Sequence, residues 1–126
     1  MKIVNGYAII DRNWQKNDKV ELMLPMQPRF VSANDSVELL QKKVAIASGP
    51  IIYGLEAEDN ADLERLHVKS TGVMKTSFNP KILNGVNTIS GEGVNEKGIR
   101  NKFLAVPFYS LGNRKPGELY QVWLPE

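Results

Sequence analysis

The sequence predicts an all-β domain, built as an antiparallel sandwich or barrel with at most one short helix. Three observations support this prediction. Several short runs alternate apolar and polar residues, which is the period of a half-buried strand. Gly and Pro separate these runs, as in Ser48-Gly49-Pro50 and in residues 112–117. Only residues 58–66 have the features of a helix, so a parallel sheet with crossover helices is not expected.

The chain is organised around residues 44–56, two apolar strands that fold back about Ser48-Gly49-Pro50. Successive side chains of a strand point to opposite faces. We expect Val44 and Ile46 on one face, joined after the turn by Ile52, and we expect Ile51, Tyr53 and Leu55 on the other. The remaining strands can then pack against this pair.

The N-terminal quarter predicts a hairpin followed by an edge strand. Residues 6–11 read as one strand and residues 19–24 as the next, with a polar turn at 15–18. Pro25 and Pro28 end the second strand because Pro cannot donate to a ladder. Residues 29–32 then form a short edge strand.

The middle of the chain is less regular. Residues 34–41 predict a loop with one helical turn. Residues 58–66 form the helix candidate, capped by Asn60 and with acidic residues at its start. Residues 67–73 and 74–78 predict short strands or extended loop.

The C-terminal third returns to strand patterns. Gly85 turns into a short strand at 86–89, and the glycines between 91 and 98 predict a mobile loop. Residues 103–109 form an apolar strand broken by Pro107, and 112–117 is a strong turn signal. Residues 119–124 predict the closing strand.

Composition excludes several classes of protein. The 126 residues suit one domain, and a net charge of +2, from 16 basic and 14 acidic residues, gives no footprint for nucleic acid or for an anionic membrane. With no Cys, the chain has no disulfide, no thiolate zinc site and no Cys nucleophile. No apolar run approaches the roughly 20 residues of a membrane span. The N-terminus lacks a signal-peptide core and enters a strand at once, so we expect a longer parent protein.

Sugar hydrolysis usually needs two carboxylates, and four acidic residues are candidates for this role. Glu56, Glu58 and Asp59 are clustered, and Glu92 lies among glycines. Because acids near a helix start have an ordinary electrostatic role, the favoured interpretation is that they are surface residues. His67, the only histidine, is interpreted as structural because no metal-binding spacing or nucleophile elbow accompanies it.

Exposed aromatic rings can stack on sugars, whereas buried ones supply core area. Tyr53, Phe108 and Tyr120 lie in apolar alternation and are predicted to be core. Trp14 follows a strand and precedes a turn, which makes it the best exposed candidate. The candidate carbohydrate-binding residues are therefore Trp14 and, in the 112–117 loop, Asn113 and Arg114.

Three blocks, in one order along nearly the whole chain, resemble the C-terminal region of glycoside hydrolase family 127 proteins, which are β-L-arabinofuranosidase-like. The first block is Gly6–Trp14, running on to Asp18 and to Leu22–Met26. The second is Lys43–Ile46 with Gly49–Glu56. The third is Ala105–Tyr109 with Asn113-Arg114, Pro116–Glu118 and Val122–Leu124.

This resemblance implies a jelly-roll-like antiparallel β-sandwich over residues 1–126, with residues 1–30 completing a preceding sandwich. It also implies a missing N-terminal helical-barrel catalytic domain as partner, where a Cys nucleophile, a Glu acid/base and a zinc held by Cys and Glu would lie. No cofactor is expected in this chain itself. The expected role is a non-catalytic accessory domain in the breakdown of plant-type glycans, with a homodimer contact as a further expectation.

Two alternatives remain at this point. One is a stand-alone carbohydrate-binding module with an oligosaccharide as its partner. The other is a small enzyme that uses Glu56 or Glu92.

Overall fold

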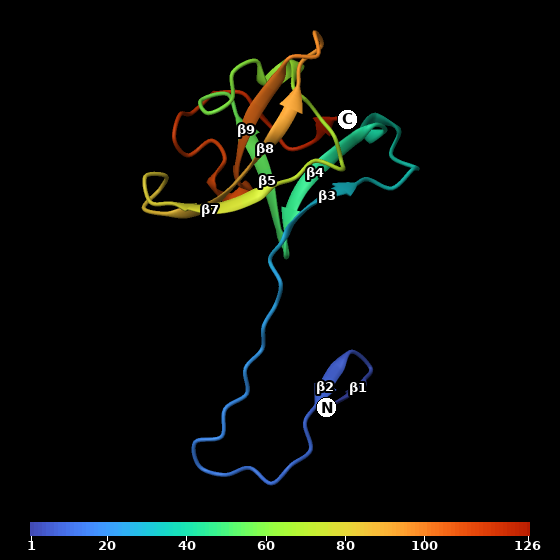
Figure 1. The fold of residues 1–126 in the computed structure, drawn as a ribbon, viewed down its shortest axis with the longest axis vertical. Coiled ribbons are helices and arrows are strands. Elements are labelled where there is room, and N and C mark those ends of the chain that lie inside the picture. The colour runs from blue at the N-terminus through green and yellow to red at the C-terminus, as the bar shows by residue number, and fades with distance from the viewer.

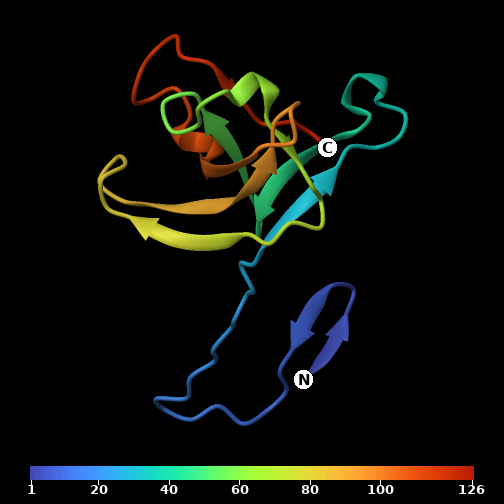
Figure 2. The same cartoon turned by 45° about the horizontal axis from the view of Figure 1, so that its top comes forward.

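A computed structural model describes residues 1–126 and confirms the all-β, antiparallel prediction. A two-stranded sheet lies apart at the N-terminus, and a nine-stranded sheet curls around one core, as expected of a β-sandwich (Figures 1 and 2). The only helices are three single 3-10 turns. None of them is long and apolar enough to cross a membrane.

The elements follow one another along the chain as short segments. The strands are β1 (Lys2–Val4), β2 (Tyr7–Ile9), β3 (Pro28–Ser32), β4 (Lys43–Ser48), β5 (Ile51–Glu56), β6 (His67–Val68), β7 (Lys75–Asn79), β8 (Val86–Val94), β9 (Arg100–Pro107), β10 (Tyr120–Gln121) and β11 (Leu124–Pro125). The 3-10 turns are η1 (Glu38–Leu40), η2 (Leu63–Arg65) and η3 (Phe108–Ser110). The edge strand predicted at 29–32 and the helical turn predicted within 34–41 are confirmed as β3 and η1.

The predicted central pair is the β4–β5 hairpin, with Gly49 at a φ of +56° in its two-residue turn. Its register places Ile46 opposite Tyr53, so these two side chains share the core face. The expectation that Ile52 joins Ile46 is wrong: Ile52 is opposite Ala47 and is 36% exposed. A turn of this length decides which residues face each other, and alternation alone does not.

The predicted closing strand is two short strands instead of one. β10 pairs with the end of β5, whereas β11 pairs with the start of β4. Because β4 and β5 pair with each other only near their turn, the C-terminal segment lies between their diverging ends. The Ser70 amide and hydroxyl both donate to the Glu126 carboxylate, which joins the end of the chain to the segment after β6.

One hydrophobic core lies inside the curled sheet. Its members come from β4, β5, β6, β8, β9, β11, the η2 turn and the residue that follows this turn. They are Val44, Ile46, Tyr53, Leu55, Leu63, Leu66, Val68, Ile89, Phe103, Ala105 and Leu124. A smaller cluster joins Ile82, Val86 and Val106. The core position predicted for Tyr53 is confirmed by its 3% exposure.

Burial raises the pKa of Tyr53 above its usual 10.0, and the nearby Tyr109 phenol adds to this effect. A group whose folded pKa is raised contributes stability that is present below its unfolded pKa and lost as pH rises through the folded pKa. We therefore expect unfolding to become easier above pH 10.0, with Tyr53 as one contributor. Tyr53→Phe keeps the ring and removes the titration, so its stability should fall less steeply than that of the natural chain in alkaline urea titrations. Equal slopes would contradict this prediction.

The N-terminal hairpin differs from the prediction. β1 pairs with β2 about Asn5-Gly6, and both turn residues have positive φ, at 50° and 82°. Asn-Gly between apolar runs is the strongest short hairpin signal, so this hairpin is predictable from the sequence. Residues 19–24, predicted to be the partner strand, form no strand, and Val20, Leu22 and Leu24 are at least 60% exposed.

Residues 1–27 extend away from the body of the domain (Figure 1). None of them is buried, and Asp18 alone is partly covered. The segment meets the body at Met26, whose carbonyl accepts a hydrogen bond from the Ser48 hydroxyl at 2.7 Å. The core described above contains no residue from this segment.

Removing residues 1–24 should therefore leave the stability of the body nearly unchanged. We expect a melting midpoint within about 2 °C of that of the full chain, because no buried apolar area is lost. Circular dichroism melts of the two chains check this. A truncated chain that fails to fold would show that the segment contributes to the core.

The predicted mobile loop at 91–98 is wrong for its first half, because β8 continues to Val94. Gly91 and Gly93 lie inside this strand. A Cβ on Gly91 would lie 2.4 Å from the Phe103 ring, and one on Gly93 would lie 2.5 Å from the His67 carbonyl oxygen. The glycines thus allow close packing within the sheet and do not mark a loop.

The predicted helix at 58–66 is also wrong, since only the η2 turn forms there. Asn60 does not cap a helix. Its buried side chain donates to the Glu56 and Leu104 carbonyls and accepts from the Leu104 amide, at 2.8–2.9 Å. These bonds hold the segment against β5 and β9.

Candidate functional site

The most buried ion-pair cluster joins Arg114 to Glu56 and Asp59, and we call it the arginine anchor. Arg114 Nε donates to Glu56 Oε2 at 2.9 Å, and Nη1 donates to Asp59 Oδ1 at 3.1 Å. Nη2 reaches both carboxylates. The side chains of Arg114, Glu56 and Asp59 are only 16%, 6% and 18% exposed. The interpretation of Glu56 and Asp59 as surface acids is therefore wrong.

The anchor fixes the loop 112–117 to the end of β5. Besides the guanidinium, Glu56 accepts a hydrogen bond from the Gly112 amide at 2.7 Å. Hydrogen bonding to Asp59, aided by Glu56, raises the pKa of Arg114 despite its partial burial. All three guanidinium nitrogens are used within the domain, so the geometry supports a structural role for Arg114.

The two other candidate carbohydrate-binding residues are not part of the anchor. Asn113 is exposed beside the anchor, and its Nδ2 donates to the Tyr109 carbonyl at 3.1 Å. Trp14 is 54% exposed in the N-terminal segment, where the Arg12 guanidinium lies 5.4 Å from its ring centroid. Figure 1 shows the N-terminal segment extending away from the body that carries the 112–117 loop, so the segment with Trp14 does not join this loop. A part in carbohydrate binding stays a prediction for all three residues.

Two aromatic residues predicted to be core are exposed. Phe108 and Tyr120 have 57% and 51% of their surface accessible, and Tyr109 has 64%. Pro107 ends β9, so Phe108 and Tyr109 enter the η3 turn, where strand alternation no longer applies. In the sequence, Phe108 and Tyr109 precede the 112–117 loop that the arginine anchor fixes, and Tyr120 follows it.

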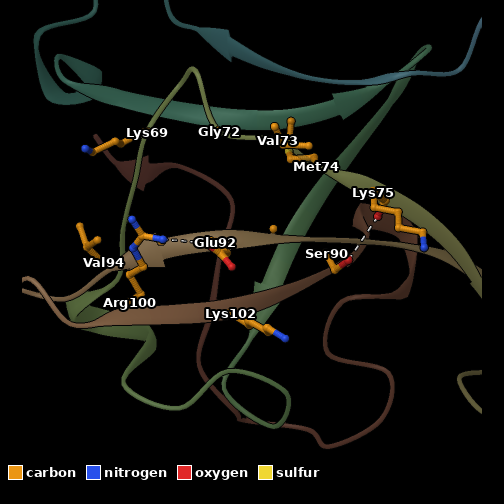
Figure 3. A pocket seen from close by; sticks show the side chains of 12 residues that line it. Lys69, Gly72, Val73, Met74, Lys75, Ser90, Glu92, Val94, Arg100 and Lys102 are labelled. Atoms are coloured by element: carbon orange, nitrogen blue, oxygen red, sulfur yellow. Dashed lines mark hydrogen bonds and ion pairs between the residues drawn. The ribbon is translucent and has the colours of Figure 1, made fainter.

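A second candidate site is a pocket of about 630 Å³ beside β8 (Figure 3). β6 pairs with residues 93–94 of β8, and β7 pairs with residues 86–90. Residues 69–74 connect these two strands without pairing to β8, and we call them the strap. The pocket lies between the strap and strands β8 and β9, and we call it the strap pocket.

The strap pocket is positively charged. Lys69, Lys75, Arg100 and Lys102 line it together with a single acid, Glu92, which gives a formal charge of +3, whereas the whole chain has only +2. Glu92 approaches Arg100 no closer than 3.9 Å, and both side chains are largely exposed. Of the four carboxylates considered from sequence, Glu92 thus lies in the strap pocket, Glu56 and Asp59 form the anchor, and Glu58 is exposed.

Both clusters join residues that lie far apart in the sequence. Arg114 is 58 residues from Glu56, and the cations of the strap pocket come from the strap and from strands β7 and β9. No local spacing predicts either arrangement. His67 lies in β6 opposite Val94 and is partly buried.

Comparisons with known proteins point to one family. The model of the glycoside hydrolase family 127 C-terminal domain matches residues 28–125. The non-reducing end β-L-arabinofuranosidase of Bifidobacterium longum subsp. longum is 29% identical over 136 aligned residues, which cover 91% of this chain and 21% of that protein.

Solved structures agree with this similarity. A family 127 β-L-arabinofuranosidase from Geobacillus stearothermophilus T6 matches with a TM-score of 0.72 and 32% identity, over 81% of this chain and 18% of that one. A second family 127 β-arabinofuranosidase matches with a TM-score of 0.68 and 28% identity, over 79% and 17%. This chain therefore spans about a fifth of the length of the relatives it matches.

Proposed function

Because the chain belongs to the glycoside hydrolase family 127 C-terminal domains, we propose that it is a non-catalytic accessory β-sandwich of a β-L-arabinofuranosidase-like enzyme. One observation carries the proposal. The family match begins at Pro28, the first residue of β3, and ends at Pro125, the last residue of β11. The matched unit is thus the folded body of this chain.

In this proposal the catalytic domain is a separate part of the parent protein, and the zinc and Cys chemistry that the resemblance implies belong there. This chain has no Cys with which to perform such chemistry. Its relatives are about five times longer, which leaves ample chain for a catalytic domain. The substrate would be a glycan that carries arabinofuranose, as the names of the relatives suggest.

We further propose that residues 1–27 pack on the domain that precedes the body. They lie outside the family match, contain no buried residue and expose large apolar side chains, among them Tyr7, Leu22 and Met23 at more than 75%. Exposed apolar surface of this extent marks an interaction site. Since Pro28 and Arg29 pair with β4, we set the boundary after Gln27 and not at residue 30.

A hydrolysis assay tests the accessory role. We expect the isolated chain to release no 4-nitrophenol from 4-nitrophenyl β-L-arabinofuranoside above the buffer rate, with or without added zinc. Release above that rate, reduced by Glu56→Gln or by Glu92→Gln, would overturn the proposal and favour a small enzyme.

A carbohydrate-binding module is the second candidate, and exposed rings favour it. Trp14, Tyr109 and Tyr120 are each more than half exposed, and the latter two flank an anchored loop. Calorimetric titration with arabinose-containing oligosaccharides should then show heat that Trp14→Ala or Tyr109→Ala reduces. Flat titrations of the natural chain would exclude this candidate.

A further inference from the structure

We propose that the strap pocket binds an anionic carbohydrate, namely a sugar ring that carries a carboxylate, as in uronic acids. The choice of a sugar rests on the proposed function. The choice of an anion rests on the pocket itself, through its shape, its charges and the absence of partners for those charges.

The shape follows from how two strands, β6 and β7, share one edge of β8. β6 and β7 pair with the two ends of this edge, and the strap passes over the residues between them, Gly91 and Glu92 (Figure 3). The Gly72 amide donates to the Lys69 carbonyl at 2.7 Å, which closes a tight turn within the strap. The resulting volume, about 630 Å³, lies within the usual range of small-molecule sites, roughly 300–1,000 Å³.

The cations around this volume are poorly compensated. No carboxylate lies within 4.0 Å of the ammonium groups of Lys69, Lys75 and Lys102. Of the five ion pairs in the chain, only the one between Arg100 and Glu92 involves residues that line the pocket. Arg100 has only the distant contact to Glu92, at 3.9 Å. Figure 3 shows these cations spread along the pocket, so a ligand that carries several carboxylates matches them better than a single carboxylate does.

The lining also suits a sugar ring. Val73, Met74 and Val94 provide apolar surface, and Val73 is 90% exposed on the strap (Figure 3). Ser90 and Glu92 can exchange hydrogen bonds with hydroxyls, because the Ser90 hydroxyl makes only a long contact of 3.5 Å to the Lys75 carbonyl. A lining that combines three apolar side chains with polar and cationic ones fits a ligand with a ring, hydroxyls and one carboxylate per residue.

NMR titration of the ¹⁵N-labelled chain tests the proposal. Three probes are compared at low salt: trigalacturonic acid, neutral β-1,4-galactotriose and tetra-aspartate. We expect trigalacturonic acid to shift amides of the strap, β8 and β9, and to bind at least about tenfold more tightly than either other probe. Raising the salt from about 20 to about 200 mM should weaken it severalfold, because exposed charges are screened.

Paired variants locate the site. Lys69→Gln with Lys102→Gln should weaken trigalacturonic acid binding about tenfold or more. Lys16→Gln with Lys19→Gln, in the N-terminal segment, makes the same change in net charge and should leave the affinity unchanged. Both pairs are exposed, so both variants are expected to fold, and their unliganded spectra verify this.

Four outcomes would overturn the proposal: no shifts with trigalacturonic acid, equal binding of galactotriose, equal binding of tetra-aspartate, or equal losses in the two variant pairs. Equal binding of tetra-aspartate would mean that the pocket recognises carboxylates without the sugar. None of these outcomes bears on the accessory role, which the hydrolysis assay decides separately.

Discussion

Tyr53→Ala is expected to lower the free energy of unfolding by about 3–5 kcal/mol, the usual cost of removing a buried aromatic ring. Tyr53 is 3% exposed and lies opposite Ile46 in the β4–β5 hairpin. Its ring is part of the single large core, which β4, β5, β8 and β9 all line. A cavity at this point would remove contacts from several strands at once. Urea titrations of the natural chain and the variant measure the loss.

Tyr120→Ala provides the matched control. Tyr120 was predicted from its alternation to be core, yet it is 51% exposed in β10. Its truncation should therefore change the free energy of unfolding by no more than about 0.5 kcal/mol. Similar losses in the two variants, or a loss below about 1 kcal/mol for Tyr53→Ala, would contradict the core described here.

The parts of the fold that depend on neighbours in sequence were predictable. The β4–β5 hairpin needs only two apolar runs and the Gly49-Pro50 turn, and the structure confirms it. The face of Ile52 was missed because alternation does not state which residues the turn sets opposite each other. The N-terminal hairpin about Asn5-Gly6 follows from this dipeptide, whereas the alternation at 19–24 predicts a partner strand that does not form.

The parts that depend on distant segments were not predictable from one sequence. Gly91 resembles a loop residue until the Phe103 ring is placed against it. Asn60 resembles a helix cap until Leu104, 44 residues away, supplies both a donor and an acceptor. β10 and β11 resemble one strand until β4 and β5 are seen to diverge.

The same limit applies to the candidate sites. Exposure of Trp14 followed from its place between a strand and a turn, and the structure agrees at 54%. The use of Arg114 could not be foreseen, because its two partners lie 55 and 58 residues earlier. The neighbours of an arginine in the sequence do not show whether its side chain lies in solvent or in a buried ion pair.

Arg114→Met is expected to lower the free energy of unfolding by about 3 kcal/mol. The change keeps much of the apolar stem but leaves the Glu56 carboxylate, 6% exposed, with the Gly112 amide as its only remaining partner. Breaking a buried ion pair from one side typically costs about 3–5 kcal/mol, and the lower end applies because Arg114 and Asp59 keep some contact with water. Chemical denaturation measures the effect. Arg100→Met, at a side chain that is 84% exposed, should cost less than about 0.5 kcal/mol.

A double variant separates the lost charge pair from lost packing. If the penalty comes from an unpaired Glu56 charge, then adding Glu56→Gln to Arg114→Met should recover stability relative to Arg114→Met alone, because a neutral amide costs less to bury. Arg114→Lys should recover only part of it, because a single ammonium cannot reach two carboxylates with the fork that Arg114 uses. If the double variant is instead less stable by the sum of the two single losses, the loop 112–117 is held by packing, and the ion pair contributes little.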